Sequence, residues 1–160
     1  MIDVEALGWP AALAGELDHR RLKAPSVKLR SARRLAGGDA IYCVDLRVRL
    51  PNAGACLSTT ELHSLEHFLL EGLQRELPED FVSIGVMGCQ TGFYLVFANE
   101  GRAPVICAAL ARILEAMLHA TAVPYARIDQ CGHYRNHGLA AAQAVAREIL
   151  ARRAGWLEAA

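Results

Sequence analysis

The chain has 160 residues, of which 53% are apolar and 21% charged, and 17 acidic residues balance 17 basic ones. This composition excludes a disordered chain, and without a basic excess nucleic acid and membrane surfaces are poor candidate partners. We expect a single domain over 1–160 in the cytoplasm, because no window is apolar enough to span a membrane and residues 1–5 lack the basic start of a signal peptide.

The first clear element is a strand. Residues 1–18 carry only a weak apolar pattern and predict no element. From Tyr42 to Leu50 apolar residues alternate strictly with polar ones, among them Asp45 and Arg47. This alternation predicts a strand with one buried and one polar face.

A capped helix and two further strands follow. Ser58 and Glu61 have the spacing of a capping box, and leucines recur at helical spacing until Pro78. Two short apolar runs, Phe81–Met87 and Phe93–Ala98, predict strands joined by a short connection that contains two glycines.

The remaining elements are helices. Pro104 suits the first turn of a helix that continues through Met117, and the Ala-rich segment from Leu139 to Arg152 predicts another that ends near Gly155. Because strands and helices mix without a regular βαβ alternation, we expect an α+β fold with a largely antiparallel sheet packed with helices.

Within the first helix, His63 and His67 lie four positions apart, so both imidazoles can reach one metal ion. Glu66 borders the same face. Two solvated histidines on an amphipathic helix are the alternative interpretation. A catalytic metal requires three protein ligands and an open position, and Cys131 is the best third ligand because Gly132 beside it allows close approach of the backbone.

Other histidines and cysteines compete for these roles. His133 and His137 are further possible ligands, although each is by default a solvated histidine. Cys89 lies between two glycines in a tight turn that can present a reactive thiol; it could instead be a small buried hydrophobe or the fourth ligand of a structural His2Cys2 site. Three cysteines receive no chemical role: Cys43, Cys56 and Cys107.

In these segments the sequence resembles the S-ribosylhomocysteine lyases, which make the precursor of autoinducer-2. Residues 63–67 resemble the family's metal-binding His-Thr-Leu-Glu-His, residues 87–94 its catalytic-cysteine segment, and residues 130–132 with His137 its third-ligand segment. Further landmarks occur in the same order at residues 17–19, 24–25, 45–47 and 51–52. The resemblance spans about residues 16–152, and residues 1–15 diverge.

The resemblance implies a homodimer with active sites at the subunit interface. It implies that His63, His67 and Cys131 hold one divalent metal, Fe2+ in the cell, with Zn2+ or Co2+ able to substitute. Cys89 and Glu66 would be the general acid/base pair, and Arg47 and His19 would contact the substrate. The small-molecule products would be homocysteine and 4,5-dihydroxy-2,3-pentanedione.

The chain departs from the family pattern where substrate specificity is set. Ala14-Gly15 stands where the family usually has Ser-Phe. The family usually has an Asp near position 83, where this chain has Ser83, and it usually has Ser-Pro where this chain has Gly85-Val86. A divergent member that acts on another sugar thioether, or with altered activity, is therefore the main alternative. An inverted-motif zinc peptidase, with Glu66 as base, and a structural zinc module are the others.

Overall fold

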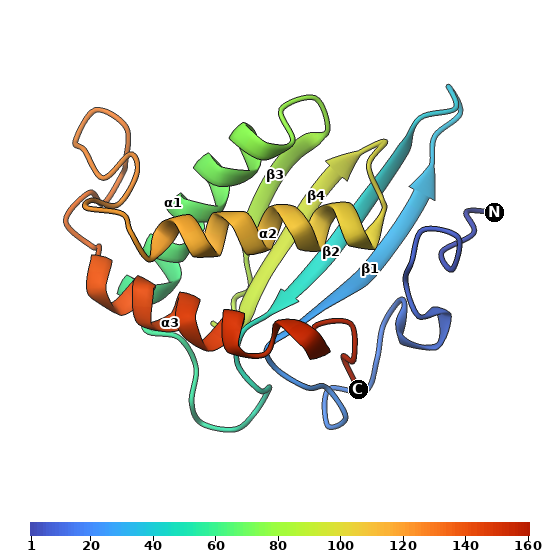
Figure 1. Cartoon of the computed structure of the whole chain (residues 1–160), viewed down its shortest axis with the longest axis horizontal. Coiled ribbons are helices and arrows are strands. Elements are labelled where there is room, and N and C mark those ends of the chain that lie inside the picture. Colours follow the sequence, from blue (N-terminus) through green and yellow to red (C-terminus); the bar gives the residue numbers. More distant parts are fainter.

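Three helices cover one face of a four-stranded antiparallel sheet (Figure 1). The computed structural model describes residues 1–160. In chain order the elements are β1 (Ser26–Arg34), β2 (Ala40–Arg47), α1 (Thr59–Glu76), β3 (Phe81–Val86), β4 (Gly92–Ala98), α2 (Ala103–Met117) and α3 (Leu139–Ala151), with single 3-10 turns at Ala11–Leu13 and Arg153–Gly155. This arrangement confirms the predicted α+β class.

The strands are ordered β1-β2-β4-β3, and every neighbouring pair is antiparallel. Strand β1 is the one strand that the sequence analysis did not predict. Strand β2 begins before its predicted start at Tyr42 and ends at Arg47, short of Leu50, because the chain turns there. The amides of Val48 and Arg49 both donate to the Thr91 carbonyl, at 2.8 and 3.0 Å, and this bend ends the regular ladder.

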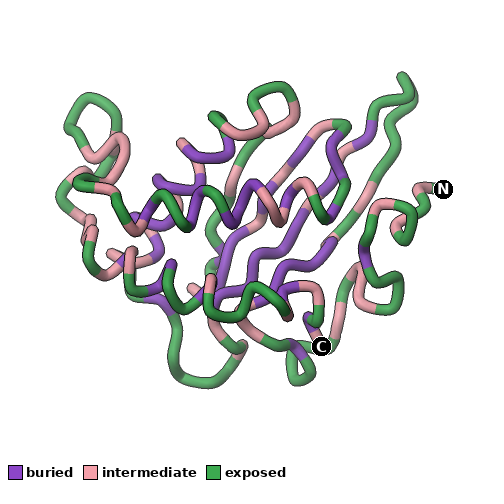
Figure 2. Tube along the Cα trace, viewed as in Figure 1, coloured by how far each residue is buried: buried purple, intermediate pink, exposed green.

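The core lies between the sheet and the helices. Twenty-nine buried residues form one cluster, to which β2 and β4 contribute alternate side chains and α1, α2 and α3 their inner faces. Figure 2 shows the buried residues concentrated along the middle of the sheet and on the sides of the helices that face it. Because a fully buried Leu or Phe contributes about 1.5–3 kcal/mol, this layer fixes the strand ends and α1, which carry the candidate site.

The polar face of β2 is covered: Asp45 and Arg47, on the side of the sheet away from the helices, are each only 3% exposed. They pair with each other through Arg47 Nη2 and Asp45 Oδ2 at 2.7 Å, and the N-terminal segment with β1 covers them. Because both ions lose their hydration, a buried ion pair of this kind is weak evidence of a stabilising role.

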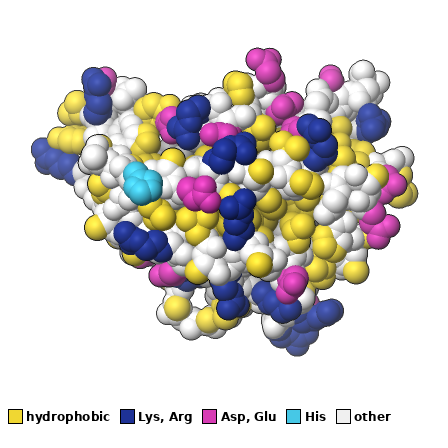
Figure 3. All heavy atoms as spheres, viewed as in Figure 1, with side chains coloured by type: hydrophobic (Ala, Val, Ile, Leu, Met, Phe, Trp, Pro, Cys, Tyr) yellow, Lys and Arg dark blue, Asp and Glu magenta, His cyan; other side chains and the backbone are white.

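The N-terminal segment is anchored to the core although it contains only one 3-10 turn. Trp9 is 2% exposed, and its Nε1 donates to the Gly101 carbonyl at 2.6 Å. None of the helices combines the length and the apolar character needed to cross a bilayer. On the helix side of the molecule, basic and acidic side chains are interspersed without a large patch of one sign (Figure 3).

Candidate metal centre and active site

Helix α1 begins as the sequence predicts. Ser58 Oγ accepts a hydrogen bond from the Glu61 amide at 3.2 Å, and Glu61 Oε2 accepts one from the Ser58 amide at 2.8 Å. The leucine side of the helix packs into the core, where Leu65 and Leu69 are fully buried. The cap and this buried side together set the rotation of the helix, and they turn His63 toward the segment that precedes α3.

The structure brings His63, His67 and Cys131 together. Cys131 Sγ lies 3.4 Å from His63 Nε2, although 68 residues separate them in the chain. His137 joins the group, and the four ligand atoms all lie within 4.8 Å of one another. Cys89 is not a member, which argues against the structural module in which Cys89 would be the fourth ligand.

Hydrogen bonds on the far side of each ring orient the histidines. His63 Nδ1 lies 3.0 Å from the Asn136 carbonyl oxygen, and His67 Nδ1 lies 2.7 Å from that of Pro124. A carbonyl can only accept, so Nδ1 of each ring donates to it, and the Nε2 atom left over is the one that a neutral ring presents to a metal. This is the second shell that metal-binding histidines usually have.

His137 differs from the expectation of a solvated histidine. Its ring centroid lies 4.0 Å from that of His63 and 4.5 Å from that of His67, and its Nε2 lies 3.7 Å from Cys131 Sγ. Desolvation, with the neighbouring histidines, lowers the pKa of His137 to about 4, so the ring is neutral at pH 7 and can donate a lone pair. The fully buried Ser64 holds this ring: its Oγ lies 3.2 Å from His137 Nδ1 and accepts from the Gly138 amide at 3.0 Å.

Two other residues singled out in the sequence, Glu66 and His133, lie beside the metal group without belonging to it. Glu66 is half-buried, and its Oε2 lies 3.9 Å from His67 Nε2. The ring of His133 is exposed and outside the group, whereas its backbone amide donates to Cys131 Sγ at 3.4 Å.

Cys89 occupies the turn between β3 and β4, as predicted, and its side chain is exposed. Its Sγ lies 2.9 Å from Thr91 Oγ1 and 4.0 Å from Arg47 Nη1. Desolvation raises the pKa of the Cys89 thiol, but hydrogen bonds from Thr91 and the charge of Arg47 outweigh it, and the pKa is lowered. The thiolate form that acts as a base or nucleophile is therefore favoured here.

Thr91 is the residue of this site that the sequence analysis missed. It is 4% exposed, and its Oγ1 also accepts from Arg47 Nη1 at 2.6 Å. The strands approach closely at this point, because a Cβ on Gly92 would lie 2.2 Å from the Leu46 carbonyl oxygen. Gly92 thus allows β4 to bring Thr91 and Cys89 up to Arg47 at the end of β2. A Gly-Cys-Gln-Thr-Gly run after a strand was the available signal.

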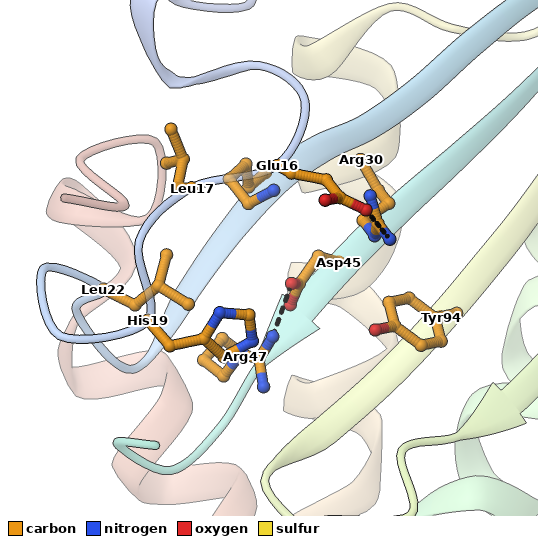
Figure 4. Close-up of a pocket in the computed structure, with 9 residues that line it drawn as sticks. Glu16, Leu17, His19, Leu22, Arg30, Asp45, Arg47 and Tyr94 are labelled. Carbon is orange, nitrogen blue, oxygen red and sulfur yellow. Dashed lines mark hydrogen bonds and ion pairs between the residues drawn. The ribbon is translucent and has the colours of Figure 1, made fainter. Parts of the chain in front are cut away.

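Two cavities adjoin this cluster, and His19 lines both. One, of about 350 Å3, is bordered by Cys89, Thr91 and the loop 50–56. The other, of about 150 Å3, lies over the buried pair of Asp45 and Arg47 (Figure 4). The metal group borders neither cavity, and no hydrogen bond joins it to Cys89, so one chain carries two separate sets of reactive residues.

Comparisons with known proteins identify the family of the chain. The family model described as S-Ribosylhomocysteinase (LuxS) matches residues 14–160. A protein of Oceanobacillus iheyensis is 40% identical over 142 residues, which cover 89% of this chain and 92% of that protein. A protein of Dichelobacter nodosus is 44% identical over 140 residues, which cover 88% of this chain and 90% of that protein. Each is named S-ribosylhomocysteine lyase.

Proposed function

The chain belongs to the S-ribosylhomocysteinase (LuxS) family, and we propose that it is a metal-dependent lyase that cleaves the thioether of S-ribosylhomocysteine. The products are homocysteine and 4,5-dihydroxy-2,3-pentanedione, the precursor of autoinducer-2. One observation carries the proposal: a histidine and cysteine group able to hold a metal ion occurs together with a cysteine of lowered pKa beside a buried arginine.

The nitrogen and sulfur donors suit one divalent transition metal that is intermediate between hard and soft. Imidazole nitrogen and thiolate sulfur bind Fe2+, Co2+ and Zn2+, whereas Mg2+ and Ca2+ prefer oxygen. We infer that His63, His67 and Cys131 are the ligands and that Fe2+ is the ion in the cell, by resemblance to the family. His137 Nε2 is a further donor within reach. When bound, the metal supplies Lewis acidity toward a sugar oxygen.

Cys89 and Glu66 move the protons. Migration of the sugar carbonyl from C1 to C3 needs a base that removes protons alpha to a carbonyl, and Cys89 Sγ as thiolate has this role. Glu66 carries protons between the sugar oxygens, since its carboxylate lies at the edge of the metal group. With the carbonyl at C3, the C4 proton is acidic. When a base removes it, the electron pair of the C4–H bond forms a C4=C5 double bond, the C5–S bond breaks, and homocysteine leaves as a thiolate.

We propose that the active protein is a homodimer with its active sites at the interface. Within one chain Cys89 is not part of the metal group, and the cavity that Cys89 borders is not lined by that group. A second copy of the chain would bring further reactive groups to each site. The sheet face without helices carries a half-buried apolar strip, formed by Ile41, Cys43, Tyr94, Val96 and Ala98. An apolar strip of this kind on the two central strands of a sheet is typical of an interface between copies.

A divergent member acting on another sugar thioether is the second candidate. Ser83 is exposed on β3 and offers no carboxylate where the family usually has one near it. Five free cysteines fit a reducing compartment, and we place the reaction in the cytoplasm.

A free-thiol assay tests the proposal. The protein, loaded anaerobically with Fe2+, is incubated with S-ribosylhomocysteine, and we expect thiol release together with formation of the dione. Release from a different sugar thioether, with none from S-ribosylhomocysteine, would favour the second candidate. Absence of thiol release from every sugar thioether would refute both.

A further inference from the structure

His137 is the member of the metal group whose role is still open. Its Nε2 lies 3.7 Å from Cys131 Sγ. Its ring centroid lies 4.0 Å from that of His63 and 4.5 Å from that of His67. In this position it could be a fourth ligand of the metal or a hydrogen-bond donor to one of the other ligands. A neutral imidazole carries one proton, so the nitrogen that holds the proton decides between the two roles.

Ser64 determines which nitrogen of His137 carries the proton. The Ser64 hydroxyl oxygen accepts a hydrogen bond from the Gly138 amide at 3.0 Å, since a backbone amide can only donate. The side chain is fully buried, so water cannot accept the hydrogen of the hydroxyl. The one acceptor in contact with this hydroxyl is His137 Nδ1, 3.2 Å from Ser64 Oγ. Because a buried donor without a partner is costly, the hydroxyl donates to Nδ1.

The proton of the His137 ring is therefore on Nε2. The lone pair of Nδ1 is used by the Ser64 hydroxyl, so Nε2 is the N–H group, and it faces Cys131 Sγ. A doubly protonated ring would leave the Ser64 hydrogen without an acceptor. His63 and His67 have the opposite arrangement, because the Nδ1 of each lies against a backbone carbonyl. They can offer an Nε2 lone pair to a metal, whereas His137 cannot.

The sulfur of Cys131 thus has two N–H donors. The His137 ring supplies one, and the backbone amide of His133 donates at 3.4 Å. Cysteine binds a metal as the thiolate, and hydrogen bonds to a metal-bound sulfur reduce the charge that the sulfur gives to the metal. A metal held here would therefore be a stronger Lewis acid toward an oxygen of the substrate.

We propose that His137 is a positioning residue of the metal centre and not a ligand: its Nε2–H donates to Cys131 Sγ and leaves one coordination position for the sugar oxygen. The inference rests on the proposed function. It also gives Ser64 a role, since its hydroxyl holds the His137 ring in the tautomer that donates.

Long-range 1H–15N NMR spectra of the Zn2+-loaded protein test the tautomers directly, because Zn2+ is diamagnetic. We expect the ring proton on Nδ1 in His63 and His67 and on Nε2 in His137. Ser64→Ala removes the hydroxyl and should add the Nδ1–H tautomer of His137, whereas Ser64→Thr keeps the hydroxyl and should leave Nε2–H alone. An Nε2 without a proton in the loaded wild-type protein would identify His137 as a ligand and overturn the inference.

The Co2+-loaded protein tests the hydrogen bond to the sulfur. In His137→Phe, which keeps a flat ring without the N–H, the charge-transfer band from the Cys131 sulfur to Co2+ should move to longer wavelength. The same variant should lower kcat/KM by about ten- to a hundredfold. His137→Gln places an amide N–H near the position of Nε2 and should recover most of both effects. His119→Phe, at an exposed position outside the group, is the control and should change neither. An unmoved band in His137→Phe would overturn the inference.

The proposed function fails in different ways from the inference. Loaded protein that gives the expected spectra but releases no thiol would refute the proposed reaction and support the role of His137. Wild-type protein that binds neither Zn2+ nor Co2+ would refute the metal centre. The His137 tautomer is then measured in the metal-free protein, where the contacts of Ser64 also predict Nε2–H, and a proton on Nδ1 there would overturn the inference.

Discussion

Replacing Thr91 by valine isolates the contact that sets the reactivity of Cys89. Valine matches threonine in shape but removes the hydroxyl that lies 2.9 Å from Cys89 Sγ and accepts from Arg47 Nη1 at 2.6 Å. A hydrogen bond to a charged group contributes about 1.5–3 kcal/mol. Because Cys89 is exposed, solvent screening places the loss at the low end, about 1.5 kcal/mol, which corresponds to roughly a tenfold smaller thiolate fraction below the pKa.

The assay is the pH dependence of Cys89 alkylation by iodoacetamide, followed on the Cys89 peptide by mass spectrometry. The wild-type pKa is lowered, so Thr91→Val should move the midpoint to higher pH. The variant should react more slowly near pH 7 and at the wild-type rate once the pH exceeds both midpoints. Thr121→Val, at an exposed position, is the control and should change nothing. An unchanged midpoint, or one moved to lower pH, would refute the role given to Thr91.

Four further predictions concern the metal, the proton transfer, the interface and the fold. Cys131→Ala should lose bound metal and activity together, measured by metal analysis after gel filtration; full retention of metal would contradict its assignment as a ligand. Cys89→Ala should keep its metal and release no thiol, and normal turnover would remove Cys89 from the mechanism. Val96→Arg on the open sheet face should convert the dimer to a monomer in analytical ultracentrifugation, whereas an intact dimer would place the interface elsewhere. Ser58→Ala should lower the free energy of unfolding in urea by about 1 kcal/mol, through loss of the helix cap; no loss would mean that the capping box adds nothing.

Most of the fold could be predicted because its signals are local. The capping box and the leucine spacing predicted α1, and alternation with short apolar runs predicted three of the four strands. Strand β1 was missed because Ser26–Arg34 is rich in basic residues. Two of its charged side chains, Lys28 and Arg30, line the cavity over Asp45, and a long-range contact of this kind leaves no periodic pattern in the sequence.

The candidate site was predictable where residue type and spacing carry the chemistry. The pair of His63 and His67 follows from helical spacing alone, and Cys131 follows from the need for a third ligand. His137 joins this group only because the buried Ser64 and the start of α3 place its ring there. Burial of Asp45 and Arg47 was not predictable either, since it depends on how the N-terminal segment folds over the sheet.

The central claim is that the histidines and Cys131 bind one metal ion while Cys89 stays free, and X-ray absorption at the metal edge tests it most directly. In the Fe2+-loaded protein we expect nitrogen neighbours and a single sulfur neighbour. That sulfur should disappear in Cys131→Ala and remain in Cys89→Ala. Two sulfur neighbours, or one that disappears with Cys89→Ala, would contradict the account.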